Sequence, residues 1–176
     1  MKLAAATSAL LVIDLQDRLM PAIKDGDQVL ANAVRLVSAA GLLDVPVLTT
    51  EQNPAGLGAT VPALAERPGP TLAKTSFDAT EAAGFDELLP PGATAVVIGA
   101  EAHVCVLQTV LGLLTRGRRV AVVTDAVGSR TEGNHAAALA RAQASGAQLV
   151  STEMVLFEWL SDSTHPRFRE VQKLIK

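Results

Sequence analysis

Apolar residues along this chain change their spacing in a regular order, from short unbroken runs to a period of three and four residues and back. Short, nearly unbroken apolar runs are typical of strands that are covered on both faces. A spacing of three and four residues places apolar side chains on one side of a helix. The runs predict strands at residues 8–14, 45–50, 70–74, 94–99, 119–124 and 148–151.

Capping and breaking residues mark the ends of the helical segments. Asp27 stands at the expected start of the first helix and Gly41 at its end. The stretch 51–60 is rich in Gly, Asn and Pro and predicts a loop. Helices are predicted at 27–41, 61–66, 79–89, 105–117, 134–145 and 154–160, with a short helical pattern at the end of the polar tail.

Alternating strands and helices predict a parallel sheet with right-handed crossovers and helices on both faces. We therefore expect an α/β fold of Rossmann-like type, a three-layer sandwich around a six-stranded parallel sheet. The chain has no internal repeat, long linker or low-complexity block, which predicts a single domain over residues 1–176. In such sheets ligands bind at the carboxyl ends of the strands.

The composition narrows the class of protein. The chain has 176 residues, 49% hydrophobic and 19% charged, which is typical of a globular domain. A net charge of −3 without a basic cluster, and only 3% aromatic residues, argue against nucleic acid or an anionic membrane as partner. The longest apolar run, 4–13, is too short to span a bilayer. A single cysteine leaves no internal disulfide and fits a reducing, cytoplasmic location.

That cysteine, Cys105, follows a predicted strand and opens a predicted helix. Free amide N–H groups and the helix dipole at such a position stabilise a thiolate and lower the thiol pKa. A small thiol that is simply buried in the core is the alternative. The position of Cys105 alone leaves both interpretations open.

Two charged residues stand, like Cys105, at the end of a predicted strand. Asp14 and Lys74 each stand at the carboxyl end of a predicted strand, so the fold brings them to the same edge as Cys105. Taken singly, Asp14 is expected to cap a turn and Lys74 to be a solvated cation. Together, a thiol, a carboxylate and an ammonium make a coherent set of nucleophile, base and activator.

The motifs around these residues resemble those of the isochorismatase-like cysteine hydrolases, a family that includes nicotinamidases and other small-amide hydrolases. The resemblance covers nearly the whole chain, and residues 50–58 are similar to a poorly characterised subgroup. The motifs are Leu-Val-Ile-Asp14-Leu-Gln16-Asp, Lys74-Thr-Ser-Phe77, Gly99-Ala-Glu-Ala-His-Val-Cys105-Val, Thr124-Asp125-Ala126 and Ser129-Arg130.

The resemblance implies a catalytic triad of Asp14, Lys74 and Cys105 and a cis peptide bond between Ala100 and Glu101. It also implies that the backbone amides of Glu101 and Cys105 form an oxyanion hole. The implied reaction is attack of the thiolate on a small amide, followed by hydrolysis of the thioester.

Three further residues are candidates for substrate binding. Gln16 and Phe77 follow the first two triad residues and are expected to line the pocket, although Gln16 is equally suited to satisfying local backbone groups. His103 lies two residues before Cys105, and direct chemistry by it is not favoured because Asp and Lys fill the activating roles. Arg130 is expected to tie its loop to Asp125 rather than to bind a carboxylate on the substrate.

Cofactors are not expected. Nicotinamidases of this family hold a metal with an Asp and several His after the second strand, whereas residues 49–54 here contain no His. His103, His135 and His165 lack ligand spacing. Neither a Gly-x-Gly-x-x-Gly nor a Walker motif is present. We expect no metal and no ordinary nicotinamidase activity.

Three functions remain: an amidohydrolase acting on a small molecule, an isochorismatase-type vinyl-ether hydrolase, and a catalytically silent scaffold of the same fold. Relatives that cleave vinyl ethers often lack the cysteine, and a scaffold would be expected to have lost a triad residue. A homo-oligomer is also expected, because family members commonly assemble and residues 155–160 are apolar. Packing of that segment on its own sheet is the alternative.

Overall fold

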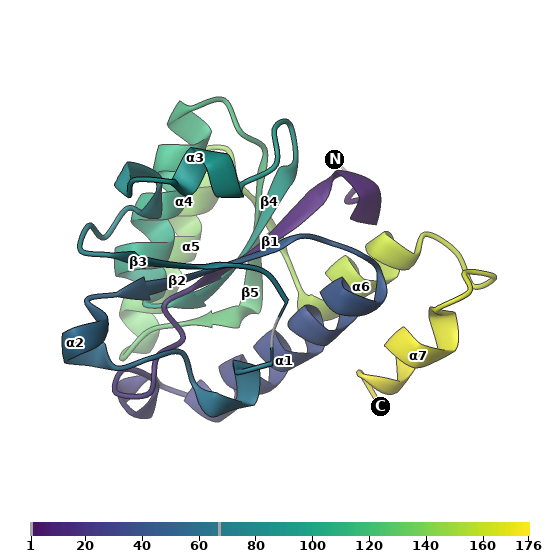
Figure 1. Ribbon diagram of the computed structural model, residues 1–176, viewed down its shortest axis with the longest axis horizontal. Helices are drawn as coiled ribbons and strands as arrows, with labels where there is room; N and C mark the ends of the chain where they lie inside the picture. The colour runs from purple at the N-terminus through teal and green to yellow at the C-terminus, as the bar shows by residue number, and fades with distance from the viewer. Residues whose placement is uncertain (1, 67) are drawn as a thin grey trace.

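A computed structural model describes residues 2–66 and 68–176 and contains one six-stranded parallel sheet (Figure 1). The strand order is β3-β2-β1-β4-β5-β6. The predicted three-layer α/β fold is confirmed. The strands are β1 (Ser8–Ile13), β2 (Val47–Gln52), β3 (Thr71–Lys74), β4 (Thr94–Ala100), β5 (Val120–Gly128) and β6 (Gln148–Val150).

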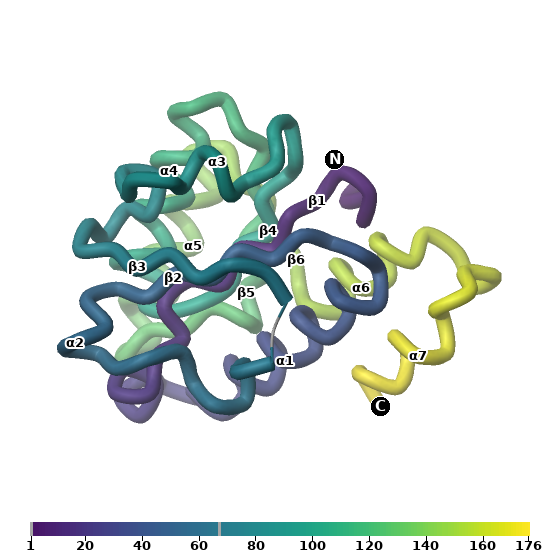
Figure 2. The backbone as a smooth tube through the Cα atoms, viewed as in Figure 1, coloured from purple at the N-terminus to yellow at the C-terminus, as the bar shows by residue number. Residues whose placement is uncertain are grey.

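Helices cover both faces of the sheet (Figures 1 and 2). On one face lie α1 (Gly26–Leu42) and α6 (Thr152–Leu160), and on the other lie α4 (Leu107–Thr115) and α5 (Glu132–Ala144). The shorter helices are α2 (Pro54–Leu57), α3 (Phe85–Leu88) and α7 (Phe168–Lys173). None of the helices in the described part of the chain is long and apolar enough to cross a membrane.

The central strand β1 is buried at every position, as its unbroken apolar run predicted. Because successive side chains point to opposite faces, Leu10 and Val12 enter the core under α1 and α6. Leu11 and Ile13 enter the core under α4 and α5. A strand with apolar side chains on both faces therefore needs helices on both faces of the sheet to bury them.

The position of β1 between β2 and β4 determines where the candidate residues meet. At its carboxyl end Ile13 pairs with Thr50 of β2 and with Gly99 of β4. Gln52 pairs with Lys74 at the end of β3. The chain passes from β1 to β2 over one face of the sheet, through α1, and from β4 to β5 over the other face, through α4. The carboxyl ends of β1 and β4 therefore flank a topological switch point.

Several predicted boundaries differ from the structure. The helix predicted over 79–89 is two short pieces, Ala79–Glu81 and α3, separated at Gly84, where a φ of +87° interrupts the helix. The first long helix starts at Gly26 behind Asp25, so Asp27 lies in its first turn instead of capping it. The predicted loop 51–60 contains the end of β2 and the short helix α2.

The apolar segment 155–160 packs mostly on its own sheet. Val155, Leu156, Trp159 and Leu160 are buried, which confirms the alternative interpretation for these four residues. Phe157, in contrast, has 43% of its surface exposed on the outer side of α6. The segment therefore packs mainly into the core of the protein, and the Phe157 side chain remains on the surface.

Candidate active site

Asp14 lies immediately after β1, fully buried and with a φ of +50°. Thr50 Oγ1 donates a hydrogen bond of 2.6 Å to Asp14 Oδ1, and Lys74 Nζ lies 2.7 Å from Asp14 Oδ2. A carboxylate without partners in a core would be strongly unfavourable. Both oxygens of this carboxylate instead have a partner.

Lys74 ends β3, and its side chain is as fully buried as that of Asp14. Its ammonium also donates to the Ser76 carbonyl at 3.2 Å. The ammonium is therefore a buried partner of Asp14 rather than the solvated loop cation that its sequence position alone suggested. Removal of either member of such a pair leaves the other charge without compensation.

Cys105 is 6% exposed and sits in a π-helical turn, Ala102–Val106, that leads into α4. Burial raises the pKa of its thiol to about 12, and the negative charge of Asp14 adds to this effect, while Lys74 opposes it. Hydrogen-bonding interactions with both side chains contribute as well, so the three residues form one cluster. The expectation that the thiol pKa would be lowered is wrong, because burial and the charge of Asp14 together outweigh the opposing charge of Lys74.

Glu101 follows a cis peptide bond with Ala100, as the sequence motif implied. Arg130 Nε donates a hydrogen bond of 2.6 Å to Glu101 Oε1. The predicted pairing of Arg130 with Asp125 is wrong, since Asp125 Oδ1 accepts hydrogen bonds from the Thr152 amide and hydroxyl at 2.8 and 2.9 Å. The reason is a register shift in β5, which pairs Val122 with Val97 but Val127 with Gly99, so that residues 123–126 have no pairing partner in β4.

Gln16 is fully buried and binds backbone groups. Its Nε2 donates to the carbonyls of Gln52 at 3.1 Å and Gly58 at 2.6 Å, and its Oε1 accepts from the Gln52 amide at 2.9 Å. These contacts are those of the alternative interpretation, in which Gln16 satisfies local backbone groups. They hold the carboxyl end of β2 against the loop that contains Gly58.

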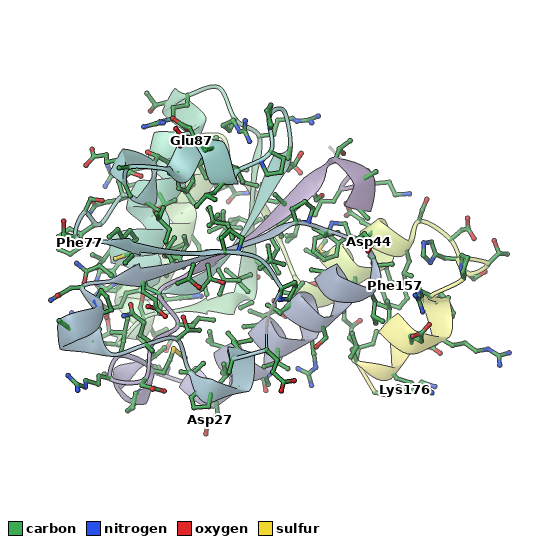
Figure 3. The ribbon with its side chains drawn as sticks, viewed as in Figure 1. Asp27, Asp44, Phe77, Glu87, Phe157 and Lys176 are labelled. Carbon is green, nitrogen blue, oxygen red and sulfur yellow. The ribbon has the colours of Figure 1, made fainter. Side chains whose placement is uncertain are left out.

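His103 and Phe77 make no hydrogen bond or ion pair with Asp14, Lys74 or Cys105 among the described contacts. His103 Nδ1 is 3.0 Å from Ser129 Oγ, which connects the π-helical turn to the end of β5. Phe77 is 50% exposed on the loop after β3 and stands at the edge of the molecule in Figure 3.

Comparison with known proteins assigns the chain to a family. A model of the isochorismatase domain matches residues 8–154. The chain belongs to the isochorismatase family. The resemblance drawn from its motifs is thereby confirmed.

Relatives of this isochorismatase-family chain match it over nearly its full length. Isochorismatase domain-containing protein 2 of Rattus norvegicus is 39% identical over 97% of this chain and 81% of its own length. MAR1 ribonuclease of Caenorhabditis elegans is 39% identical, with a TM-score of 0.94 over 99% of this chain and 92% of its own. YcaC of Pseudomonas aeruginosa, solved with hexane-2,5-diol and covalent acrylamide, is 26% identical, with a TM-score of 0.90 over 98% and 91%.

One residue of this site was not singled out by the sequence. Thr50 is fully buried at the end of a strand, where its hydroxyl binds Asp14. The available signal was weak, because a Thr in a strand is ordinary. Its contact with Asp14 depends on the alignment of β1 with β2.

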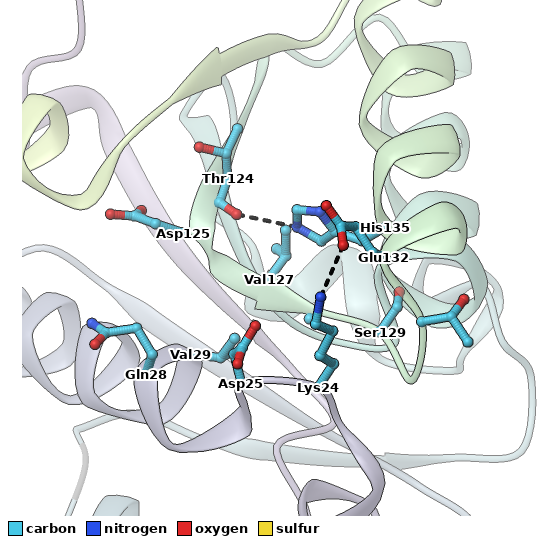
Figure 4. A pocket seen from close by; sticks show the side chains of 12 residues that line it. Lys24, Asp25, Gln28, Val29, Thr124, Asp125, Val127, Ser129, Glu132 and His135 are labelled. Atoms are coloured by element: carbon cyan, nitrogen blue, oxygen red, sulfur yellow. Dashed lines mark hydrogen bonds and ion pairs between the residues drawn. The ribbon is translucent and has the colours of Figure 1, made fainter.

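Of two cavities near the carboxyl ends of the strands, one borders the cluster. One of about 520 Å³ opens beside Lys74 and is lined by residues 53–55, 73–76 and 81–83. The other, of about 280 Å³, lies at the carboxyl half of β5 between the starts of α1 and α5 (Figure 4). There Lys24 Nζ is 2.9 Å from Glu132 Oε2, and His135 Nε2 is 3.2 Å from the Thr124 carbonyl oxygen. The second cavity contains no member of the Asp14 cluster.

Residues 49–54, the stretch that corresponds to the metal site of nicotinamidases, contain no His. After β2, the Glu51 carboxylate accepts hydrogen bonds of 2.7 Å from the Thr60 amide and hydroxyl. Among residues 2–66 and 68–176, no group of three or more His, Cys, Asp or Glu side chains is placed to hold a metal ion. The described residues after β2 therefore do not fit the metal site of nicotinamidases.

Proposed function

We propose that this protein is a cysteine-dependent hydrolase that cleaves the C–N bond of a small amide through a thioester on Cys105. The family to which it belongs suggests hydrolase activity in general. The observation that carries the finer proposal is the buried ion pair of Lys74 and Asp14, 2.7 Å apart and beside the thiol. Nucleophile, base and cation are the parts that covalent hydrolysis requires.

The first half of the reaction forms the thioester. With a pKa of about 12, the Cys105 thiol carries its proton at neutral pH, so attack requires proton transfer. Asp14 accepts this proton as Sγ bonds to the amide carbon, and Lys74 stabilises the charges that result. Collapse of the tetrahedral intermediate breaks the C–N bond, and Asp14 gives the proton to the departing nitrogen. An amine leaves and the acyl group remains on sulfur.

The second half releases the acid. Asp14 takes a proton from water, whose oxygen attacks the thioester carbon. Collapse of this intermediate breaks the C–S bond, and the proton returns from Asp14 to the cysteine. The backbone amides of Glu101 and Cys105 are proposed to bind the oxyanion of both intermediates, where loss of one donor typically costs about 10²–10³ in rate.

Substrate binding is assigned to the residues that surround the cluster. Phe77 and His103 are proposed to contact the substrate, since each is partly exposed on a loop or turn next to a cluster residue. Gln16 is proposed to act there mainly by holding the end of β2. A small amide is the proposed substrate class, because a nucleophile, a base and a cation at one site are the parts that covalent cleavage of an amide requires.

The proposal is tested by a turnover screen over small amides, carbamates and isochorismate. We expect release of ammonia or an amine by the parent protein and no turnover by Cys105→Ala, which removes only the sulfur. Turnover of an amide by Cys105→Ala at the parental rate would overturn the nucleophile assignment. Turnover of isochorismate alone would favour the vinyl-ether hydrolase, and no turnover of any compound would favour the silent scaffold.

Ribonuclease activity is a second candidate because one relative of 39% identity is named a ribonuclease. The same parent and Cys105→Ala samples are incubated with single-stranded RNA. The net charge of −3 predicts weak RNA binding, since affinity for nucleic acid comes largely from phosphate contacts with cations. Cleavage of RNA that survives repeated purification and disappears in Cys105→Ala would favour this candidate over the amidase.

We also propose that the protein forms a homo-oligomer and acts in the cytoplasm on a small molecule, without a cofactor and without binding nucleic acid or membrane. The exposed Met154 and Phe157 on α6, at 52% and 43%, support the assembly. Large apolar side chains on one side of a surface helix are typical of interfaces.

A further inference from the structure

Thr50 contacts Asp14 twice. Its backbone carbonyl accepts a hydrogen bond of 3.1 Å from the Asp14 amide, which continues the pairing of β1 with β2. Its hydroxyl donates the bond of 2.6 Å to Asp14 Oδ1. Both residues are fully buried, so no water competes for either bond.

The two oxygens of the Asp14 carboxylate are bound from two different strands. Thr50 on β2 binds Oδ1, and Lys74 on β3 binds Oδ2. One bond would leave the carboxylate free to turn about its Cβ–Cγ axis, whereas two bonds on opposite oxygens fix its plane. A fixed plane keeps the carboxylate directed at the thiol.

We propose that Thr50 is a positioning residue that keeps the Asp14 carboxylate in place for proton transfer with Cys105. This inference rests on the proposed function, in which Asp14 takes and returns a proton in both halves of the reaction. Thr50 does not touch the substrate; it acts through Asp14. Misplacement of a reacting group by about 1 Å can cost roughly 10²-fold in rate.

Two substitutions separate the hydroxyl from the rest of the side chain. Thr50→Val keeps the branched shape and the backbone bond to Asp14 but removes the hydroxyl. Thr50→Ser keeps the hydroxyl and removes the methyl group. With the amide identified by the screen, we expect Thr50→Val to lower kcat by roughly tenfold or more with little change in KM. Thr50→Ser should stay within about threefold of the parent in kcat.

Equal losses of kcat in both variants would overturn the proposal, because the methyl packing would then be the important feature. A parental kcat in Thr50→Val would overturn it as well. Thermal unfolding of each variant identifies a general loss of structure, and a variant that melts much below the parent is compared at a temperature where both are folded.

A second measurement needs no substrate. The charge of Asp14 raises the thiol pKa, so a carboxylate that is no longer held beside the thiol lets this pKa fall. The probe is iodoacetamide at pH 8. We expect Asp14→Asn and Thr50→Val to react faster than the parent and Thr50→Ser to react like the parent. A parental rate in Thr50→Val, with a faster rate in Asp14→Asn, would contradict the inference.

The two measurements distinguish failure of this inference from failure of the proposed function. If no amide is hydrolysed but the alkylation rates change as expected, Thr50 still positions Asp14 and the proposed reaction is wrong. If amides are hydrolysed through Cys105 but Thr50→Val behaves like the parent in both measurements, the reaction stands and Thr50 has no positioning role.

Discussion

Lys74 Nζ lies 2.7 Å from Asp14 Oδ2, and neither side chain has any exposed surface. The two residues stand at the ends of β3 and β1, with β2 between them. Such a pair needs close partners because desolvation of each ion is expensive. Its energetic consequences can be measured apart from any catalysis.

Lys74→Met should destabilise the fold by about 3–5 kcal/mol, because it leaves the Asp14 carboxylate buried and uncompensated. Denaturant unfolding followed by circular dichroism measures this loss. The double variant Asp14→Asn/Lys74→Met is the control, and it should lose less than the sum of the two single variants. Additive losses would mean that the two charges do not stabilise each other.

Alkylation of Cys105 by iodoacetamide should be slow at pH 7 and accelerate up to high pH. The thiol pKa is raised to about 12 by burial and by Asp14, so only a small fraction is thiolate at neutral pH. Mass spectrometry of the intact protein measures the rate. Rapid modification at pH 7 would contradict the raised pKa, and unfolded protein provides the reference rate for an exposed thiol.

The raised pKa of the Cys105 thiol predicts that the free energy of unfolding falls at alkaline pH. The folded thiol keeps its proton up to about pH 12, whereas the unfolded thiol loses it near its usual pKa of 9.0. Above pH 9 the folded state therefore binds more protons, and the free energy of unfolding decreases as pH rises toward 12. Urea unfolding over this range should give a steeper decrease for the parent than for Cys105→Ala. If the free energies of unfolding of the two proteins decreased in parallel with pH, the raised thiol pKa would be contradicted.

Arg130→Gln should change stability by about 1 kcal/mol or less, since the Arg130 side chain is 58% exposed and its ion pair with Glu101 is screened by solvent. Its effect on turnover is expected to be larger, roughly tenfold, because the pair fixes the residue whose amide is proposed to bind the oxyanion. Glu101→Gln, which keeps an acceptor for Arg130, is the matched control. A change in stability without a change in kcat would limit the pair to a structural role.

Phe157→Asp should reduce the oligomer mass without affecting the fold, because the side chain is 43% exposed on α6. Light scattering measures the mass of the oligomer, and thermal unfolding shows whether the variant is folded. Glu87→Lys on α3 changes charge at the other side of the molecule and serves as the control (Figure 3). An unchanged mass in Phe157→Asp would mean that the exposed side of α6 does not form the interface.

The strands and the candidate residues at their ends could be predicted because both follow from local sequence. An apolar run that stops at a charged residue identifies a buried strand and its end, and the ends of parallel strands meet at one edge. Asp14 and Lys74 were found in this way. Helix boundaries were less accurate near Gly84 and Cys105, where a positive φ and a π-helical turn break the regular spacing.

Contacts between strands could not be predicted in the same way. Thr50 reaches Asp14 through the alignment of β1 with β2, and Arg130 reaches Glu101 through the register shift of β5. The direction of the Cys105 pKa shift also depended on burial, which no local pattern measures. The amino-acid sequence thus determined the α/β architecture and which residues stand at the strand ends, because hydrophobic period is a local property. Only the tertiary structure decided their partners and the protonation of the thiol, because register and desolvation arise when the strands and helices pack together.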